Sequence, residues 1–357
     1  MDPARLIPSP DTIPVHWGWF QALLTLTFIL HILVMNTMLG SGILALVREL
    51  KTGSDPDPVS RDISKKLPYT IAFTVNLGVA PLLFVQVLYG QFIYTSSILM
   101  AVYWLAVIGL VIVAYYSAYL YDFKFDALGQ ARLIFIAVTV LILTVVALIF
   151  TNNMTLMLRP GSWGRYFTNP GGTLLNLSDP MLYPRYLHFI TASVAVGGLV
   201  QALIWSLKYK SGAAHTRDHV TSGLNWFMGA TCVQMVWGLW FLLSLPGSIR
   251  ALFLGGSSLH TALLLLAVLG GILSLVLAAR QREWQALWAL LSTVTLMVFT
   301  RELLRSAFLG AWFTPANLTV TGEYSPMVLF LISLAAGLVL VVYMLRLAAA
   351  AGKEVAP

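Results

Sequence analysis

The sequence predicts an all-α integral membrane protein, a bundle of about nine transmembrane helices. Of its 357 residues, 59% are hydrophobic and 10% are charged, and the mean hydropathy is +0.83. Ordinary globular domains carry about 25% charged residues, so this composition excludes a soluble protein. Because a helix needs about 20 apolar residues to cross the hydrocarbon core, the apolar segments leave room for eight or nine spans. The chain therefore reads as a single membrane domain over residues 1–357.

Apolar runs and the residues that interrupt them give the expected spans. These are 18–47, 69–95, 98–121, 132–151, 184–207, 221–246, 257–279, 284–304 and 325–347. The polar stretch 152–183, rich in Asn, Gly and Pro, is expected to cap the outer face between spans four and five. The loop 48–66 is expected to be flexible, and no internal repeat is evident. The N-terminus lacks the basic start and apolar stretch of a signal peptide, so the first span is expected to remain in the mature protein.

The distribution of Lys and Arg predicts the orientation of the chain. With the N-terminus outside, 14 of the 21 Lys and Arg fall in inside loops and the tail, as the positive-inside rule requires. Nine spans then place the C-terminus in the cytoplasm. The net charge of +7 is therefore a topology signal, and nucleic-acid binding is not implied. The single cysteine, Cys232, excludes a disulfide framework and a C-x-x-C-H attachment, so any haem must be held noncovalently.

Histidines inside spans are the first candidates for a functional site, because ionisable groups in a membrane are costly and usually mark function. His188, about one turn into the fifth span, and His260, at the outer start of the seventh, are expected at one depth. There they could clamp one haem iron, or each could be hydrogen-bonded to a neighbouring helix. His31, about four turns into the first span, is expected to have no partner histidine at its depth. It suits a haem with one strong axial ligand or a structural histidine.

The remaining histidines favour simpler roles. His215 and His219 are four residues apart, a spacing that can bind metal, but a solvated helix start beside Arg217 is the better interpretation. His16 lies near Trp17 at the outer interface, where aromatic residues form a belt, so an anchor is the better interpretation and a contact with haem or its propionate is the alternative.

Three segments carry a resemblance to a known family. They are HILVMNTMLG (31–40), the second span with Asn76 and Gly78, and PRYLHFITASVAVGGLV, which contains His188. These segments resemble subunit I of the cytochrome bd quinol oxidases, a family of the bacterial cytoplasmic (inner) membrane. The resemblance implies a nine-span fold with haem b, in which His188 ligates a low-spin haem b and His31 ligates a second haem.

The departures from the family pattern affect the expected activity. His260 stands where the family has a methionine ligand, and the third span (98–121) has no acid. The eighth span reads TLMVFTRELLRSAF without the family's Gly-Arg-Gln-Pro-Trp motif, and the short PGSIRALFLGGSS replaces the quinol-binding loop. Oxygen reduction would need carboxylates for proton delivery, so these losses argue against quinol oxidase activity by the known route.

The resemblance and its departures imply a haem b membrane subunit, with one or two haems, that passes electrons between quinone and a redox partner outside. Arginines on the outer side could pair with haem propionates or act as interfacial charges: Arg159, Arg165, Arg185 and Arg250. A c-type cytochrome is the expected partner, because this chain has no cysteine pair for a covalent haem. Its expected docking surface is the outer segments 152–183 and 305–325, with Trp163, Phe167 and Trp312, although positions in the interfacial aromatic belt would explain these three residues equally well. The alternatives are a terminal oxidase variant and a haem-free membrane anchor or proton-coupled transporter.

Overall fold

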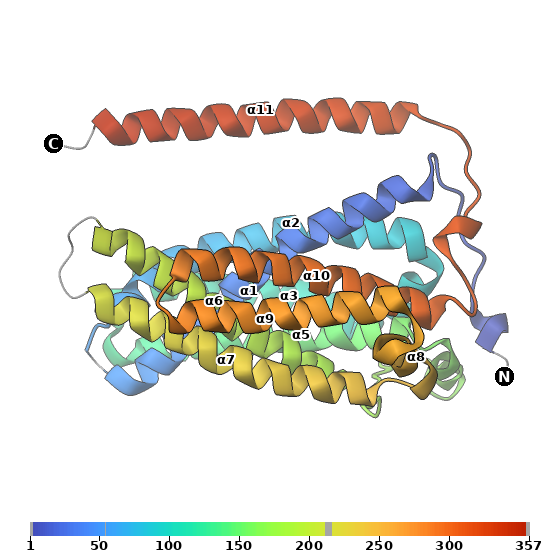
Figure 1. Cartoon of the computed structure of the whole chain (residues 1–357), viewed down its shortest axis with the longest axis horizontal. Coiled ribbons are helices and arrows are strands. Elements are labelled where there is room, and N and C mark those ends of the chain that lie inside the picture. Colours follow the sequence, from blue (N-terminus) through green and yellow to red (C-terminus); the bar gives the residue numbers. More distant parts are fainter. Residues whose placement is uncertain (1–2, 54, 211–215, 355–357) are drawn as a thin grey trace.

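The chain folds into a bundle of long antiparallel helices, with one helix standing apart (Figure 1). The computed structural model describes residues 3–53, 55–210 and 216–354. Within these residues, nine helices are long and apolar enough to cross a membrane, which confirms the predicted fold class. They are α1 (Trp17–Thr52), α2 (Pro58–Leu99), α3 (Ala101–Phe123), α5 (Arg132–Met157), α6 (Leu182–Lys210), α7 (Thr216–Ser244), α9 (Ser258–Ala279), α10 (Glu283–Leu309) and α11 (Ser325–Glu354). The protein is therefore a multi-pass α-helical membrane protein.

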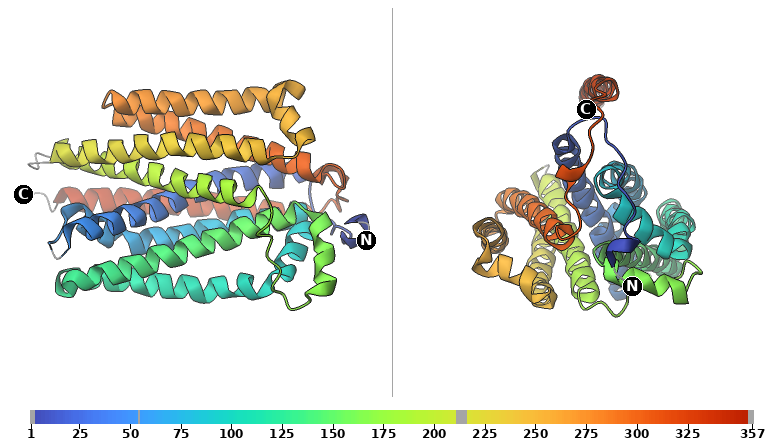
Figure 2. Two further views of the ribbon diagram at one scale, coloured as in Figure 1. Left: turned by 90° about the horizontal axis from the view of Figure 1, so that it is seen from below. Right: turned by 90° about the vertical axis from the view of Figure 1, so that its right-hand side faces the viewer.

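Short helical elements connect the long helices. They are η1 (Pro3–Leu6), α4 (Phe125–Leu128), η2 (Gly129–Ala131), η3 (Pro160–Thr168), α8 (Gly247–Ala251), the π-helical turn η4 (Leu252–Gly256) and η5 (Pro315–Asn317). The segment predicted as a cap, 152–183, begins inside α5 and contains η3. It lies at the end of the bundle that also holds the N-terminus (Figure 2), which we call the N-terminal end.

The connection between the first two helices is more ordered than the sequence suggested. α1 continues to Thr52 and α2 begins at Pro58, so most of the predicted flexible loop 48–66 is helical. Asp57 caps α2, because its carboxylate accepts a hydrogen bond of 2.8 Å from the Ser60 amide. The same carboxylate forms an ion pair with Arg48 at 3.2 Å. Pro58 is the first residue of α2. Proline has no backbone N–H, but the N–H groups of a first helical turn have no acceptor within the helix, so no helical hydrogen bond is lost. Local capping therefore starts α2 well before the membrane span that hydropathy detects.

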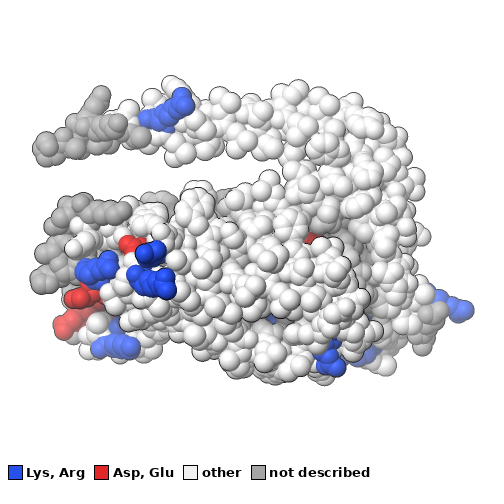
Figure 3. Space-filling model, in the orientation of Figure 1, with Lys and Arg blue, Asp and Glu red and all other residues white. Residues whose placement is uncertain are grey.

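Charge separates the two ends of the bundle. The helix ends and turns where α1 meets α2, α3 meets α5, α6 meets α7 and α9 meets α10 carry 12 of the 21 Lys and Arg, and we call their end of the molecule the basic end. On the face seen in Figure 3, charged side chains gather near the ends and leave a broad uncharged belt along the helices. Such a belt is typical of a surface that contacts lipid.

Small residues hold the centre of the bundle together. A Cβ atom at Gly40 on α1 would lie 1.8 Å from the Ser193 carbonyl oxygen on α6, and one at Gly197 would lie 2.5 Å from the Gly40 carbonyl carbon. α6 and α7 meet in the same way at Gly198 and Gly223, where a Cβ would come within 2.7 Å of the other helix's backbone. In lipid, helices associate through such close packing because no hydrophobic force drives them together.

Substitution of Gly40 should therefore break the α1–α6 contact. Gly40→Leu is expected to lower the free energy of unfolding by about 3 kcal/mol or more, since backbone atoms and not a flexible side chain occupy the space. Gly109→Leu on α3, where nothing lies within 4 Å of the added Cβ, is the matched control. Unfolding of both variants in detergent mixtures measures the difference. Equal stability of the two variants would contradict the close approach.

A buried ion pair joins three helices near the basic end. Arg132 on α5 approaches the Glu49 carboxylate on α1 at 3.3 Å, and the Tyr121 hydroxyl on α3 donates to the same carboxylate at 2.9 Å. Both charged side chains are almost fully buried, at 2% and 1% exposure. The Arg132 guanidinium also lies over the Phe125 ring, 4.6 Å from its centroid. This cluster fixes α1, α3 and α5 relative to one another.

Helix α11 stands apart from the rest of the bundle in both side and end views (Figures 1 and 2). None of its membrane-spanning window is buried. The segment before it is nevertheless attached to the bundle: Ile13 and Thr319 to Thr321 exchange backbone hydrogen bonds of 2.9 Å, and Phe313 is buried against Tyr89 and Phe92. The apolar surface of α11 itself suits contact with lipid on all sides.

Candidate functional site

His31 lies in a pocket between α1 and α2. Its Nδ1 is 3.2 Å from the Thr74 carbonyl oxygen, and its ring packs on Gly78, where an added Cβ would lie 2.9 Å from the ring. A carbonyl oxygen only accepts hydrogen bonds, so Nδ1 carries the proton of the neutral ring. The Nε2 lone pair is then available to a ligand. Phe28, one turn earlier, lies beside the imidazole with ring centroids 6.4 Å apart.

His188 occupies an equivalent pocket between α6 and α7. Its Nδ1 is 3.1 Å from the Gln234 carbonyl oxygen, and its ring packs on Gly238, where an added Cβ would lie 3.3 Å away. The same argument assigns the proton to Nδ1. The Gln234 side-chain nitrogen is 3.4 Å from Nε2, where an amide N–H meets the lone pair. In both pockets the carbonyl comes four residues before the glycine on the partner helix.

The two pockets form a pair across the α1–α6 crossing. Gly40 follows His31 by nine residues, Gly197 follows His188 by nine, and these two glycines touch. Nine helical residues rise about 14 Å, and both helices run in the same direction from the crossing, so the two imidazoles lie at a similar depth. The expectation that His31 has no partner histidine at its depth is therefore wrong. The shared spacing is also a short internal repeat, where the sequence predicted none.

His260 lies in a different environment near the start of α9. Its Nδ1 is 2.8 Å from the Ser257 hydroxyl, and its ring meets Phe253 edge-on with centroids 5.1 Å apart. A hydroxyl both donates and accepts, so this contact leaves the proton position of the ring open. α7 packs against both α6, which carries His188, and α9.

A cluster of arginines lies at the N-terminal end of the bundle, where α6 begins and α10 ends. Arg185, Arg301 and Arg305 line one small cavity together with Met154 and Met157. Arg185 and Arg305 are buried, at 7% and 4% exposure. The cluster extends toward His31 because the Arg301 guanidinium lies over the Phe28 ring, 4.1 Å from its centroid.

One carboxylate partly balances this positive charge. Glu302 accepts hydrogen bonds of 2.8 Å from both Arg301 and Arg305, and its Oε2 also accepts one of 3.1 Å from Gln21 on α1. Arg185 has no side-chain hydrogen bond or ion pair with any described residue, and contacts the Phe241 ring at 5.6 Å. Burying an unpaired charge is costly, and an anion in this cavity would offset the excess positive charge.

The other predicted arginines are engaged elsewhere. Arg159 forms an ion pair with Asp179 at 3.1 Å and lies over the Phe308 ring. Arg250 donates to the Leu243 carbonyl oxygen at 2.9 Å and so caps the end of α7. Arg165 donates to Asn176 at 2.7 Å within the cap. Of the four arginines named from the sequence, Arg185 alone joins the cavity.

Several further sequence expectations have simple outcomes. Trp163 is buried and donates its indole N–H to the Leu156 carbonyl oxygen at 2.9 Å, so its assignment to a docking surface is wrong. Phe167 and Trp312 are exposed. His16 is the N-cap of α1, its Nδ1 accepting from the Gly18 amide at 3.1 Å. His219 packs on Trp205, whereas His215 lies outside the described residues.

The fold and these pockets define a multi-pass membrane protein with paired intramembrane imidazoles and a buried arginine cluster. A scan against protein-family models finds no match for this chain, and no curated protein matches its sequence. Among the described residues, no three His, Cys, Asp or Glu side chains form a group that could hold a metal ion. A haem iron needs only one or two axial ligands from the protein, so the two imidazoles remain suitable donors.

Proposed function

We propose that the protein is a haem b-containing membrane electron-transfer subunit. It would pass electrons between quinone or quinol and a redox partner on the outer face. The observation that carries the proposal is the shared geometry of His31 and His188, each with Nδ1 held by a backbone carbonyl so that Nε2 carries the lone pair that could ligate iron. Metal-bound histidines usually donate their other ring N–H in this way, which fixes the tautomer and orients the ring. At His188 the Gln234 side-chain amide, 3.4 Å from Nε2, would have to turn away to admit the iron.

The residues behind each imidazole fix its position. Gly78 and Gly238 lack the Cβ that would crowd the ring, so each imidazole packs directly on the backbone of the partner helix. The hydrogen bond to the carbonyl increases the basicity of Nε2. Bound haem would supply one-electron chemistry, while the protein sets its orientation and potential. His260, with its own Nδ1 hydrogen bond, is proposed as the second axial ligand of the His188 haem.

The arginine cluster suits the carboxylates of a haem. A guanidinium binds a carboxylate through two parallel hydrogen bonds, and Arg185 lacks any such acceptor among the described residues. Arg185, Arg301 and Arg305 are therefore the proposed propionate partners. They replace Arg159 and Arg250, which do not line this cavity.

The orientation of the chain follows the positive-inside rule, with the basic end in the cytoplasm of a bacterial cell and the N-terminal end outside. Phe167 and Trp312 are 61% and 41% exposed at the N-terminal end and are the proposed contacts for a c-type cytochrome. Electrons arriving at the haems would leave the membrane through this partner. No quinol oxidase activity is expected from this chain.

The reduced-minus-oxidised absorbance spectrum of the purified full chain tests the proposal. We expect the bands of b-type haem after reduction by dithionite. A colourless protein that is folded, as judged by its elution and helical content, would contradict it and favour a membrane anchor or transporter.

Removing one arginine of the cluster should change the midpoint potential of the haem without removing the haem. Arg185→Leu is expected to keep the haem but shift its midpoint potential downward, because a positive charge near a carboxylate and the iron favours the reduced state. Potentiometric titration measures the shift. Arg250→Leu, which removes an arginine at the same end of the bundle, should leave the potential unchanged. Equal midpoint potentials in the two variants would show that the arginine cluster does not contact the haem.

A further inference from the structure

Two lysines from different helices converge on one carboxylate at the basic end. Lys66 on α2 and Lys208 on α6 approach the same oxygen of Asp62, Oδ1, at 2.5 Å and 2.7 Å, and we call this place the α2–α6 junction. The two ammonium nitrogens therefore lie within about 5 Å of each other. The Asp62 side chain is 11% exposed, whereas those of Lys66 and Lys208 are 47% and 36% exposed. The carboxylate is thus mostly covered, while both lysines remain accessible to a ligand.

Neighbouring side chains position these two lysines. Lys66 follows Asp62 by four residues, so their ion pair joins successive turns of α2. The Lys208 ammonium lies over the Trp205 ring, 4.1 Å from its centroid, and Trp205 is buried. A cation over an aromatic face is attracted to it, so the indole and the carboxylate hold Lys208 together. The spacing of the two ammonium groups is therefore set by the fold.

Positive charge exceeds negative charge at the α2–α6 junction. Lys66 and Lys208 bring two positive charges, and the exposed Lys65 on the same turn of α2 brings a third. Asp62 brings one negative charge. An anion that reached the two accessible ammonium groups would be attracted by this excess.

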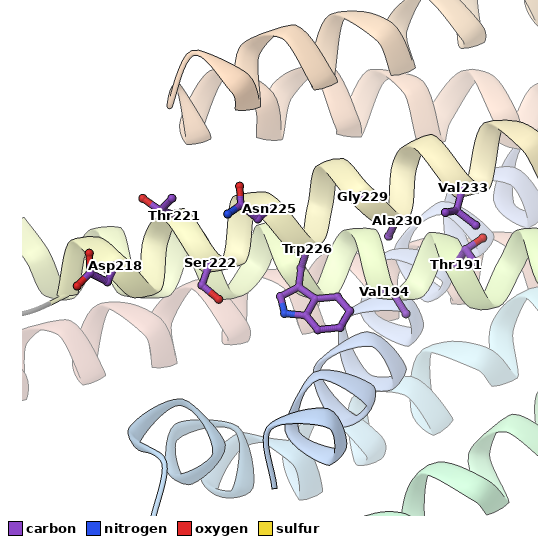
Figure 4. Close-up of a pocket in the computed structure, with 10 residues that line it drawn as sticks. All are labelled: Thr191, Val194, Asp218, Thr221, Ser222, Asn225, Trp226, Gly229, Ala230 and Val233. Carbon is purple, nitrogen blue, oxygen red and sulfur yellow. The ribbon is translucent and has the colours of Figure 1, made fainter. Parts of the chain in front are cut away.

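Most of the other carboxylates at the basic end have a cation of their own. Asp218 lies at the start of α7, which runs beside α6 (Figure 4), and it directly follows the exposed Arg217. Three further groups are ion pairs: Arg48 with Asp57, Arg61 with Asp122 and Asp126, and Arg132 with Glu49. The positive excess at the junction is therefore a local feature of α2 and α6.

The junction lies where the uncharged belt of the bundle ends. Residues 67–99 of α2 and 186–207 of α6 include no Lys, Arg, Asp or Glu. Lys66 and Lys208 are consequently the first cations that follow these two apolar stretches toward the basic end. The phosphates of a bilayer leaflet lie at this boundary between hydrocarbon and water.

Exposed aromatic side chains continue from the junction into the apolar belt. Tyr69, 66% exposed, lies one turn beyond Lys66 on α2, and Phe73, 61% exposed, lies one turn further. Tyrosine favours the level of the lipid headgroups, where its ring and hydroxyl meet different surroundings. Phe73 offers an apolar surface to an acyl chain. These features suit a ligand with an anionic head and an apolar tail.

We propose that the α2–α6 junction binds the headgroup of an acidic phospholipid in the leaflet at the basic end. Its phosphodiester accepts hydrogen bonds from the ammonium groups of Lys66 and Lys208, and an acyl chain lies along Tyr69 and Phe73. Basic sites between membrane helices recognise anionic headgroups in this way. The cationic amine of a zwitterionic headgroup would meet like charges here, so the site selects a headgroup without a cation. The binding does not depend on haem.

Native mass spectrometry of the full chain tests the site in micelles that contain equal amounts of phosphatidylglycerol and phosphatidylcholine. We expect the unmodified chain to retain phosphatidylglycerol preferentially. Lys66→Gln leaves the link between Lys208 and Asp62 intact and should lower the affinity for phosphatidylglycerol about fivefold. Adding Lys208→Gln should lower it further, to at least about tenfold below the unmodified chain. Lys66→Arg keeps the positive charge and should keep the lipid.

Lys124→Gln is the matched control, because Lys124 is also an exposed lysine at the basic end but lies in the turn after α3. Its affinity for phosphatidylglycerol should equal that of the unmodified chain. Glycerophosphoglycerol, the same phosphodiester without acyl chains, should not displace the lipid. Displacement by this compound would assign the junction to soluble phosphates and overturn the lipid site. Equal retention of the two lipids, or equal losses in Lys124→Gln and Lys66→Gln, would also overturn it.

Discussion

Replacing His188 with Ala is expected to remove one of two b-type haems from the purified chain and leave the other. The carbonyl of Gln234 and the glycine at 238 position the imidazole, but neither can replace its Nε2 as an iron ligand. His31→Ala should remove the other haem, and the double variant should contain none. The number of haems per chain in each variant is measured from the absorbance of the pyridine haemochrome.

Two controls separate ligation from folding. His16→Ala changes an exposed helix cap and should keep both haems. In His188→Gly, added imidazole should restore the lost absorbance by filling the space of the missing ring, which a purely structural histidine would not do. Full haem content in both His31→Ala and His188→Ala would refute the assignment. His260→Ala tests the second axial position, since it should convert the His188 haem from low to high spin.

Removal of the Glu49 carboxylate is expected to cause the largest loss of stability away from the haem pockets. Glu49→Leu leaves Arg132 buried in the protein without its counter-charge. Breaking a buried ion pair from one side costs about 3–5 kcal/mol, and the Tyr121 hydroxyl loses its acceptor as well. The free energy of unfolding in mixed micelles should fall by this amount.

Asp126→Ala provides the comparison at an exposed ion pair. Asp126 is 75% exposed and pairs with Arg61 at 3.3 Å. Exposed pairs contribute about 0–1 kcal/mol, so this variant should unfold almost as the unmodified chain does. A similar small effect for Glu49→Leu would show that the Arg132 cluster is not a structural link between α1, α3 and α5.

Hydropathy was sufficient to predict the number of helices, because each span must bury its backbone polar groups in lipid and therefore be a long apolar helix. It could not locate the ends of α2, which begins eleven residues before the predicted span. That start depends on the Asp57 cap and on charged residues that lie outside the hydrocarbon. Apolar periodicity also could not show that α11 stands apart, because its composition resembles that of the packed helices.

The candidate site was predicted in part. His31 and His188 could be found because histidines are rare in spans, but their equivalence depends on Gly40 and Gly197, which pack at the crossing. The shared H-x8-G spacing was present in the sequence and could have signalled the pair. The approach of Arg301 and Arg305 to Arg185 could not be derived, since it depends on how α10 packs across α1 and α6.

The most direct test of the haem assignment is a cryo-electron microscopy map of the purified chain in nanodiscs. We expect two planar densities, one joined to Nε2 of His31 and one to Nε2 of His188, with carboxylate density reaching toward Arg185, Arg301 and Arg305. A map with ordered imidazoles in which side chains or lipid, and not an iron-centred group, contact both Nε2 atoms would contradict it.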